Sequence, residues 1–152
     1  MENLKNPIQF EKQQLADGYL ATSYSIRFTD AVGVERVFSS IYHKNTRETS
    51  YILHTMASQE KTQAALGAIL KYMEGRYGLN LIPVYYGNID SMYGDPEEIS
   101  KCWFTLNSID FELFIDWENN VIALAQKQGG AGSDFPDKLA VALARCATMI
   151  RK

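Results

Sequence analysis

The sequence contains few of the side chains on which disulfide-rich and metal-binding proteins depend. Among 152 residues there are two cysteines, Cys102 and Cys146, and two histidines, His43 and His54. Two thiols cannot build a disulfide framework, and no Cys-x-x-Cys pair or zinc-like Cys/His spacing occurs. We therefore expect a cytoplasmic protein with reduced thiols, no bound metal and no cofactor.

Positive charge is also scarce, and it is scattered. Fifteen Lys and Arg residues stand against eighteen Asp and Glu, which gives a net charge of −3, and no basic run occurs. Binding a nucleic-acid backbone needs several cations on one surface. The only candidates for such a surface are Arg27, Arg36, Lys44 and Arg47. Nucleic acid is therefore not an expected partner.

Long apolar runs are missing as well. No stretch reaches the length of a membrane-spanning helix. The first fourteen residues lack the apolar region of a secretory signal peptide. We expect neither a membrane partner nor a secretory leader.

The common catalytic and ligand-binding motifs do not occur. Residues 129–133, Gly-Gly-Ala-Gly-Ser, lack the Lys-Ser/Thr of a phosphate-binding loop and the third glycine of a dinucleotide fingerprint, which favours a flexible joint. The acidic segment 88–98 does not fit an EF-hand. A looser cation site from Asp90, Asp95 and Glu98 is the alternative to a solvated loop. No GxSxG elbow is present.

The remaining candidates for chemistry have simpler interpretations. Asp110, Glu112 and Asp116 share one face of a predicted strand, where carboxylates are more often solvated than paired for acid–base catalysis. His43 and His54 fall at opposite ends of two paired strands and should not meet. We therefore expect that the protein is not an enzyme.

Residue periodicity predicts most of the secondary structure. Asn6-Pro7 indicates a short first helix that ends near Asp17-Gly18. Alternating residues then predict a meander of three strands over 19–29, 34–42 and 50–56. A helix capped by Ser58 and Gly78 follows. Later strands are expected at 79–86, 103–106, 111–117 and 121–126, with a last helix from Pro136.

These elements favour one domain over residues 1–152 of the α+β class. Strands come in runs, so we expect a mostly antiparallel sheet of six to seven strands packed against two main helices. Pro83 lacks the N–H of a central strand, which places its strand at the sheet edge. No internal repeat is visible in the sequence.

Aromatic residues provide the main functional signal. Several later strands are apolar on both faces, so some rings either complete the core or form an exposed patch suited to a protein partner. The candidate partner-binding residues are Tyr85, Tyr86, Tyr93, Trp103 and Trp117.

We therefore expect a protein-binding module that acts by stoichiometric association with another protein or with a second copy. An inhibitor, an immunity-type protein or a secretion-chaperone-like adaptor would fit equally. The alternative is a small-molecule-binding or enzymatic domain with a pocket between the sheet and the C-terminal helix.

Overall fold

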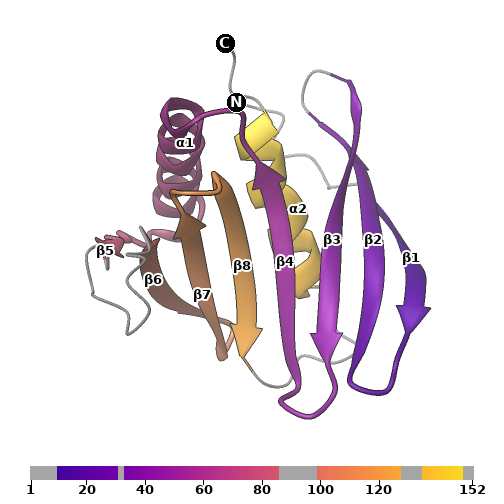
Figure 1. The fold of residues 1–152 in the computed structure, drawn as a ribbon. Helices are drawn as coiled ribbons and strands as arrows, with labels where there is room; N and C mark the ends of the chain where they lie inside the picture. Colours follow the sequence, from indigo (N-terminus) through magenta and orange to yellow (C-terminus); the bar gives the residue numbers. More distant parts are fainter. Residues whose placement is uncertain (1–9, 31–32, 86–98, 128–134, 149–152) are drawn as a thin grey trace.

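The computed structural model describes residues 10–30, 33–85, 99–127 and 135–148 (Figure 1). Eight antiparallel strands form one sheet in the order β1-β2-β3-β4-β8-β7-β6-β5. The first four are β1 (Phe10–Asp17), β2 (Ala21–Thr29), β3 (Glu35–His43) and β4 (Glu48–Thr55). The others are β5 (Val84–Tyr85), β6 (Ile99–Leu106), β7 (Ile109–Asp116) and β8 (Val121–Lys127). The helices are α1 (Gln59–Tyr77) and α2 (Phe135–Thr148). The predicted α+β class is confirmed.

The same order of elements occurs twice along the chain. Four strands and α1 are followed by four strands and α2, and the two meanders join where β4 pairs antiparallel with β8. The topology therefore has a pseudo-two-fold axis through the middle of the sheet. Because this repetition lies in the order of elements, the residue pattern alone did not reveal it.

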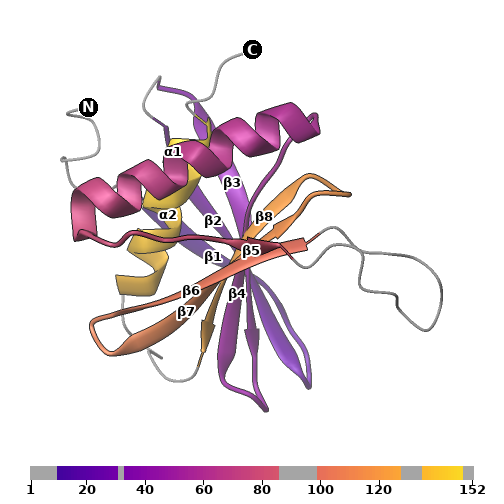
Figure 2. The same ribbon diagram turned by 90° about the vertical axis from the view of Figure 1, so that its left-hand side faces the viewer.

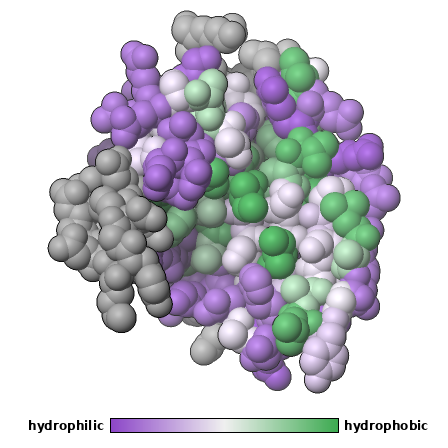
Figure 3. Space-filling view, in the orientation of Figure 1, coloured by the Kyte–Doolittle hydropathy of each residue, from purple (hydrophilic) through white to green (hydrophobic). Residues whose placement is uncertain are grey.

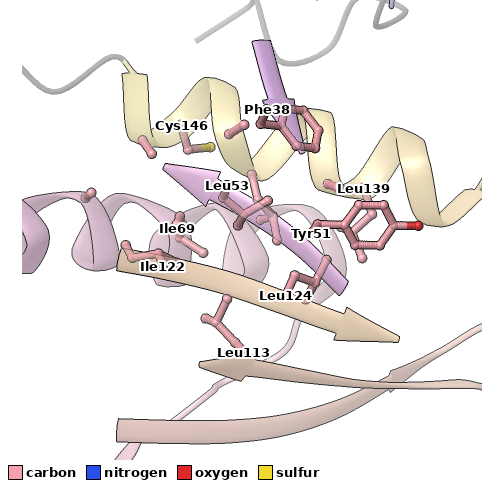
Figure 4. Packing of buried hydrophobic residues seen from close by; sticks show 14 of the residues in the cluster. Phe38, Tyr51, Leu53, Ile69, Leu113, Ile122, Leu124, Leu139 and Cys146 are labelled. Carbon is pink, nitrogen blue, oxygen red and sulfur yellow. The ribbon is translucent and has the colours of Figure 1, made fainter. Parts of the chain in front are cut away.

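Both helices pack on one face of the sheet (Figure 2). Alternation along the strands directs one set of apolar side chains toward them, including Phe38, Tyr51 and Leu124, which are at most 5% exposed. Ile69 of α1 and Leu139 of α2 meet this layer (Figure 4). Every residue of α2 from Leu139 to Ala147 is buried, so this helix lies inside the core.

Helix α1 begins and ends where its capping residues predict. The Ser58 side chain accepts a hydrogen bond from the Lys61 backbone N–H at 3.2 Å. At the other end Gly78 adopts a left-handed conformation, with φ of 70°, and its N–H donates to the Glu74 carbonyl at 2.9 Å. Glycine reaches this conformation without the steric cost that a Cβ imposes.

The predicted N-terminal helix is wrong over residues 10–17, which form β1; residues 1–9 lie outside the described part of the chain. Phe10–Asp17 is rich in helix-forming residues, but its backbone pairs with β2 along almost its whole length. The ladder with β2 supplies hydrogen bonds that a short isolated helix could not retain in water. This extra strand brings the sheet to eight.

The two edges of the sheet are protected in different ways. At one edge β5 is two residues long and follows Pro83, which correctly indicated an edge strand, but the strand predicted over 79–86 is wrong at residues 79–83, which are not part of the sheet. At the other edge β1 carries Glu11 and Lys12, and its register shifts between Gln14 and Ala16. Short length, proline, charge and a bulge all discourage further strand pairing.

Candidate functional site

The face of the sheet turned away from α1 and α2, here called the open face, is the candidate functional surface. No described element lies on it (Figures 1 and 2). Its exposed apolar side chains come from four strands: Val37 is 60% exposed, Ile52 39%, Val84 49% and Trp103 51%. Figure 3 shows hydrophobic residues spread across the centre of this face among weakly polar ones.

Strand register places the residues of the open face in rows that cross the sheet. One row contains Ser25, Ser39, Ile52, Ala123, Phe114 and Lys101. The next contains Ser23, Ile41, Ser50, Ala125, Glu112 and Trp103. Serines predominate on the β2–β3 side, whereas the two large rings stand on β6 and β7. In these two rows the side chains of β2 and β3 are therefore short except for Ile41, whereas those of β6 and β7 are bulky.

A hollow of about 330 Å³ lies beside Trp103, where β6, β7 and β8 run together. Its lining residues are Trp103, Phe104, Thr105, Asp110, Phe111 and Lys127. Asp110 faces Lys127 across the ladder and accepts a hydrogen bond from the Thr105 hydroxyl at 2.6 Å. The hollow thus combines an aromatic wall with one carboxylate and one ammonium group.

The charges of the open face are largely compensated within the chain. Lys101 lies 3.4 Å from Glu112, and Lys127 lies 4.0 Å from Glu48. The second pair occupies the two central strands, and both of its side chains remain more than a third exposed. Such exposed pairs stabilise the fold little and leave their charges able to interact with another molecule.

The aromatic residues predicted to bind a partner do not form one cluster. Trp103 lies on the open face, whereas Trp117 packs against the core on the helix side, and its ring N–H donates to Ser100 Oγ at 2.8 Å. The backbone of Tyr85 belongs to β5. Tyr86 and Tyr93 lie outside the described residues. Val37 and Ile52 are members of the surface that the aromatic pattern missed.

The candidates for catalysis are dispersed. His43 and His54 lie at opposite ends of the β3–β4 pairing, as predicted. Both cysteines are buried free thiols. Burial, with a contribution from Glu112, raises the pKa of Cys102 to about 11, and burial raises that of Cys146 to about 12. These thiols are therefore protonated and weak nucleophiles at neutral pH.

The two ligand-site alternatives weighed for the sequence lie outside the described chain. Among residues 10–30, 33–85, 99–127 and 135–148, no three His, Cys, Asp or Glu side chains come close enough to hold a metal ion. The weaker cation candidate, Asp90 with Asp95 and Glu98, lies outside these ranges, as does the glycine-rich joint 129–133.

The four cations considered for nucleic acid do not gather into a basic patch. Arg36 lies 2.8 Å from Asp30, and Lys44 lies 2.7 Å from Asp17. Arg27 lies 3.9 Å from Glu35. Arg47 sits in the β3–β4 turn, where its φ is 61°. Three of the four positive charges therefore face a carboxylate of the same chain.

A polar cluster that sequence reasoning missed fastens β1 to the first turn of α2. Lys12 Nζ lies 3.0 Å from Asp137 Oδ2 and 4.4 Å from the centre of the Tyr24 ring. The Tyr51 hydroxyl is hydrogen-bonded to Asp137, and burial, with the nearby carboxylate, raises the Tyr51 pKa above its ordinary value. The helix N-terminus also favours negative charge at Asp137. The cluster holds the edge strand in place.

Comparisons with family models, with curated proteins and with solved structures find no match. Neither helix among the described residues combines the length and apolarity needed to cross a membrane. The open face is consequently the strongest structural indication of function in the described chain.

Proposed function

We propose that the protein is a binding module that associates stoichiometrically with a protein partner through its open face. One observation carries the proposal: Val37, Ile52 and Trp103 are exposed on the sheet face that neither α1 nor α2 covers. Exposed apolar residues grouped on one face are typical of interaction sites, and tryptophan is a frequent anchor at interface centres.

The polar residues of the same face also suit association. The Lys127–Glu48 pair is partly exposed at both ends, and the serines of this face offer hydroxyl groups between the apolar side chains. Protein interfaces combine an apolar centre with satisfied polar groups in this way. An inhibitor, an immunity-type protein or a client-binding adaptor would need this surface and no catalytic group.

A reducing compartment, such as the cytoplasm, fits the proposal. Cys102 and Cys146 are both buried and both free. Disulfides form and persist in oxidising compartments, and reduced thiols are usual elsewhere.

The hollow beside Trp103 supports a second candidate, which is the binding of a small ligand between the indole ring, Asp110 and Lys127. Its volume of about 330 Å³ is at the lower end of the range for ligand pockets. Protein binding is favoured because the exposed apolar surface extends over several strands beyond the hollow.

Site-specific photo-crosslinking in the cell of origin tests the proposal. A photoreactive amino acid at Val37 should give one dominant protein adduct, whereas the same residue at Gln63 on the exposed side of α1 should give none. The Val37 adduct should weaken when Trp103 is replaced by serine. Adducts of equal yield at both positions, or none at Val37, would contradict the proposal.

A further inference from the structure

We infer that the molecule occupying the open face is a second copy of the chain. The two sheets stack face to face about a two-fold axis that runs parallel to the strands, between β4 and β8. The inference rests on the proposed function, because it fills the same surface. We place the axis at the boundary between β4 and β8, because the sheet has four strands on either side of that boundary. Its direction along the strands brings complementary side chains together.

The two halves of the open face are complementary in size under this operation. The axis places β2 and β3 of one copy over β6 and β7 of the other. The serines at 23, 25 and 39 therefore lie opposite the half that carries Trp103 and Phe114. Next to the axis, Ile52 lies over Ala123 of the second copy, and Ser50 lies over its Ala125. Large side chains thus meet small ones at Trp103, Phe114 and Ile52, whereas Ile41 lies over Glu112 of the second copy.

The charges are complementary as well. Register places Ala21, His43, Glu48, Lys127, Asp110 and Thr105 in one row. The axis sets Lys127 of each copy opposite Glu48 of the other, and it sets the Asp110 carboxylate opposite the His43 ring, whose N–H can donate a hydrogen bond. Stacked sheets are about 10 Å apart, a gap that two long side chains can bridge.

The Lys127–Glu48 contact has to accommodate the rotation between stacked sheets. Aligned sheets cross at about 30°, and the resulting displacement is smallest at the centre of the interface and grows toward the strand ends. Glu48 begins β4 and Lys127 ends β8, so the length of the two side chains, rather than their position, allows them to meet. Glu112, farther out, remains compensated by Lys101 of its own chain at 3.4 Å.

The area is sufficient for a stable pair. Six neighbouring strands of the sheet, β2, β3, β4, β8, β7 and β6, have seven to nine residues each. At about 4.8 Å between strands and about 3.3 Å per residue, they span roughly 750 Å². A standard interface buries about 800 Å² per partner. The open face therefore matches the size that specific association needs.

Sedimentation equilibrium of the purified chain with single charge reversals tests the inference. The wild-type chain should sediment at twice its monomer mass. Lys127→Glu alone, or Glu48→Lys alone, should raise the dimer dissociation constant on the order of 100-fold, because the axis repeats each like-charge contact. Lys71→Glu and Glu74→Lys on the exposed side of α1 are the controls, and they should leave the dimer dissociation constant unchanged.

Mixing the two single variants provides the decisive measurement. One chain then carries Glu at 48 and 127 and the other carries Lys at both, so both contacts across the axis join opposite charges. The equimolar mixture should form a heterodimer, although each chain keeps an unfavourable pair within itself. A restored dimer therefore depends on contacts between chains.

Two results would overturn the inference. The first is a wild-type chain that sediments as a monomer. The second is a mixture that stays monomeric while the wild-type chain dimerises. Neither result removes the proposed function, because a crosslink from Val37 to a different protein would still support that. The absence of a Val37 crosslink together with a monomeric chain would contradict both the proposed function and the dimer.

Discussion

The carboxylate of Asp137 lies between two hydrogen-bond donors in a nearly dry environment. Its side chain is 9% exposed, with Lys12 at 3.0 Å and the Tyr51 hydroxyl as its second partner. A buried charge is tolerated when its partners are present and becomes costly when one partner is lost. The cluster therefore links the position of β1 to the first turn of α2.

We expect Asp137→Ala to lower the free energy of unfolding by about 3 kcal/mol, because the Tyr51 hydroxyl and the Lys12 ammonium lose their shared partner. Urea unfolding followed by circular dichroism measures the change. Glu35→Ala removes an exposed carboxylate 3.9 Å from Arg27 and should cost less than about 0.5 kcal/mol. Equal losses of unfolding free energy for the two variants would show that the buried cluster stabilises the fold no more than an exposed ion pair does.

The two thiols should resist modification in the folded protein. Burial raises their pKa values from 9.0 to about 11 for Cys102 and about 12 for Cys146, and the thiolate is the reactive form. We expect iodoacetamide at pH 8 to alkylate neither residue in native buffer and both in urea, as counted by mass spectrometry. Rapid native labelling of either cysteine would contradict the burial described here.

The same shifts predict how stability changes at alkaline pH. Each folded thiol has a pKa above its unfolded value of 9.0, so its contribution is complete below pH 9. The contribution of each thiol to the free energy of unfolding falls as the pH rises from 9 through its folded pKa of about 11 or 12, because the unfolded chain releases its proton more readily. Urea midpoints measured from pH 8 to pH 11 should decline above pH 9. The urea midpoint of the Cys146→Ala variant should decline less steeply over the same pH range.

At the scale of elements, the two glycines near the end of α1 have opposite requirements. Gly78 has a φ of 70°, whereas a Cβ at Gly75 would meet nothing within 4 Å. Gly78→Ala should destabilise the protein by about 1 kcal/mol, because alanine is strained in the left-handed region. Gly75→Ala should stabilise it by about 0.5–1 kcal/mol through helix propensity. Changes of the same sign in urea unfolding would refute this account of the cap.

The sequence predicted the elements whose periodicity is strong. Ser58 and Gly78 marked both ends of α1, and alternation predicted the β2–β3–β4 meander, which the structure confirms. β1 was missed because its eight residues lack alternation and consist largely of helix-forming types. Only the adjacent β2 ladder decides its conformation, and short-range patterns do not contain that information.

The composition of the open face could be predicted only in part. Trp103 was singled out from its strand, but Trp117 had the same signal and lies on the helix side. When both faces of a strand are apolar, nothing local indicates which face the helices cover. The Glu48–Lys127 pair could not be foreseen, because it depends on β4 and β8 becoming neighbours across a long stretch of chain.

At the scale of the whole molecule, the two meanders share one core. β4 pairs with β8 along most of its length, and α1 packs on α2 above them. Neither half can therefore lose its structure without exposing apolar surface of the other. Small domains of this kind usually unfold in one cooperative step.

Spectroscopy can test this cooperativity without a substitution. Trp103 and Trp117 are the only tryptophans, and both belong to the second half, whereas circular dichroism reports on strands and helices of both halves. We expect fluorescence and circular dichroism to give the same urea midpoint. Two separated midpoints would show that the halves unfold independently.

The protected edges of the sheet determine what kind of assembly the chain can build. A fibre grows by adding backbone to a free strand border, and here one border is two residues long after Pro83 while the other is charged and bent. When two copies stack face to face, both open faces are buried, so no surface of this kind remains for a third molecule. Raising the concentration should therefore yield more closed pairs, and solutions of the protein should stay clear of polymer.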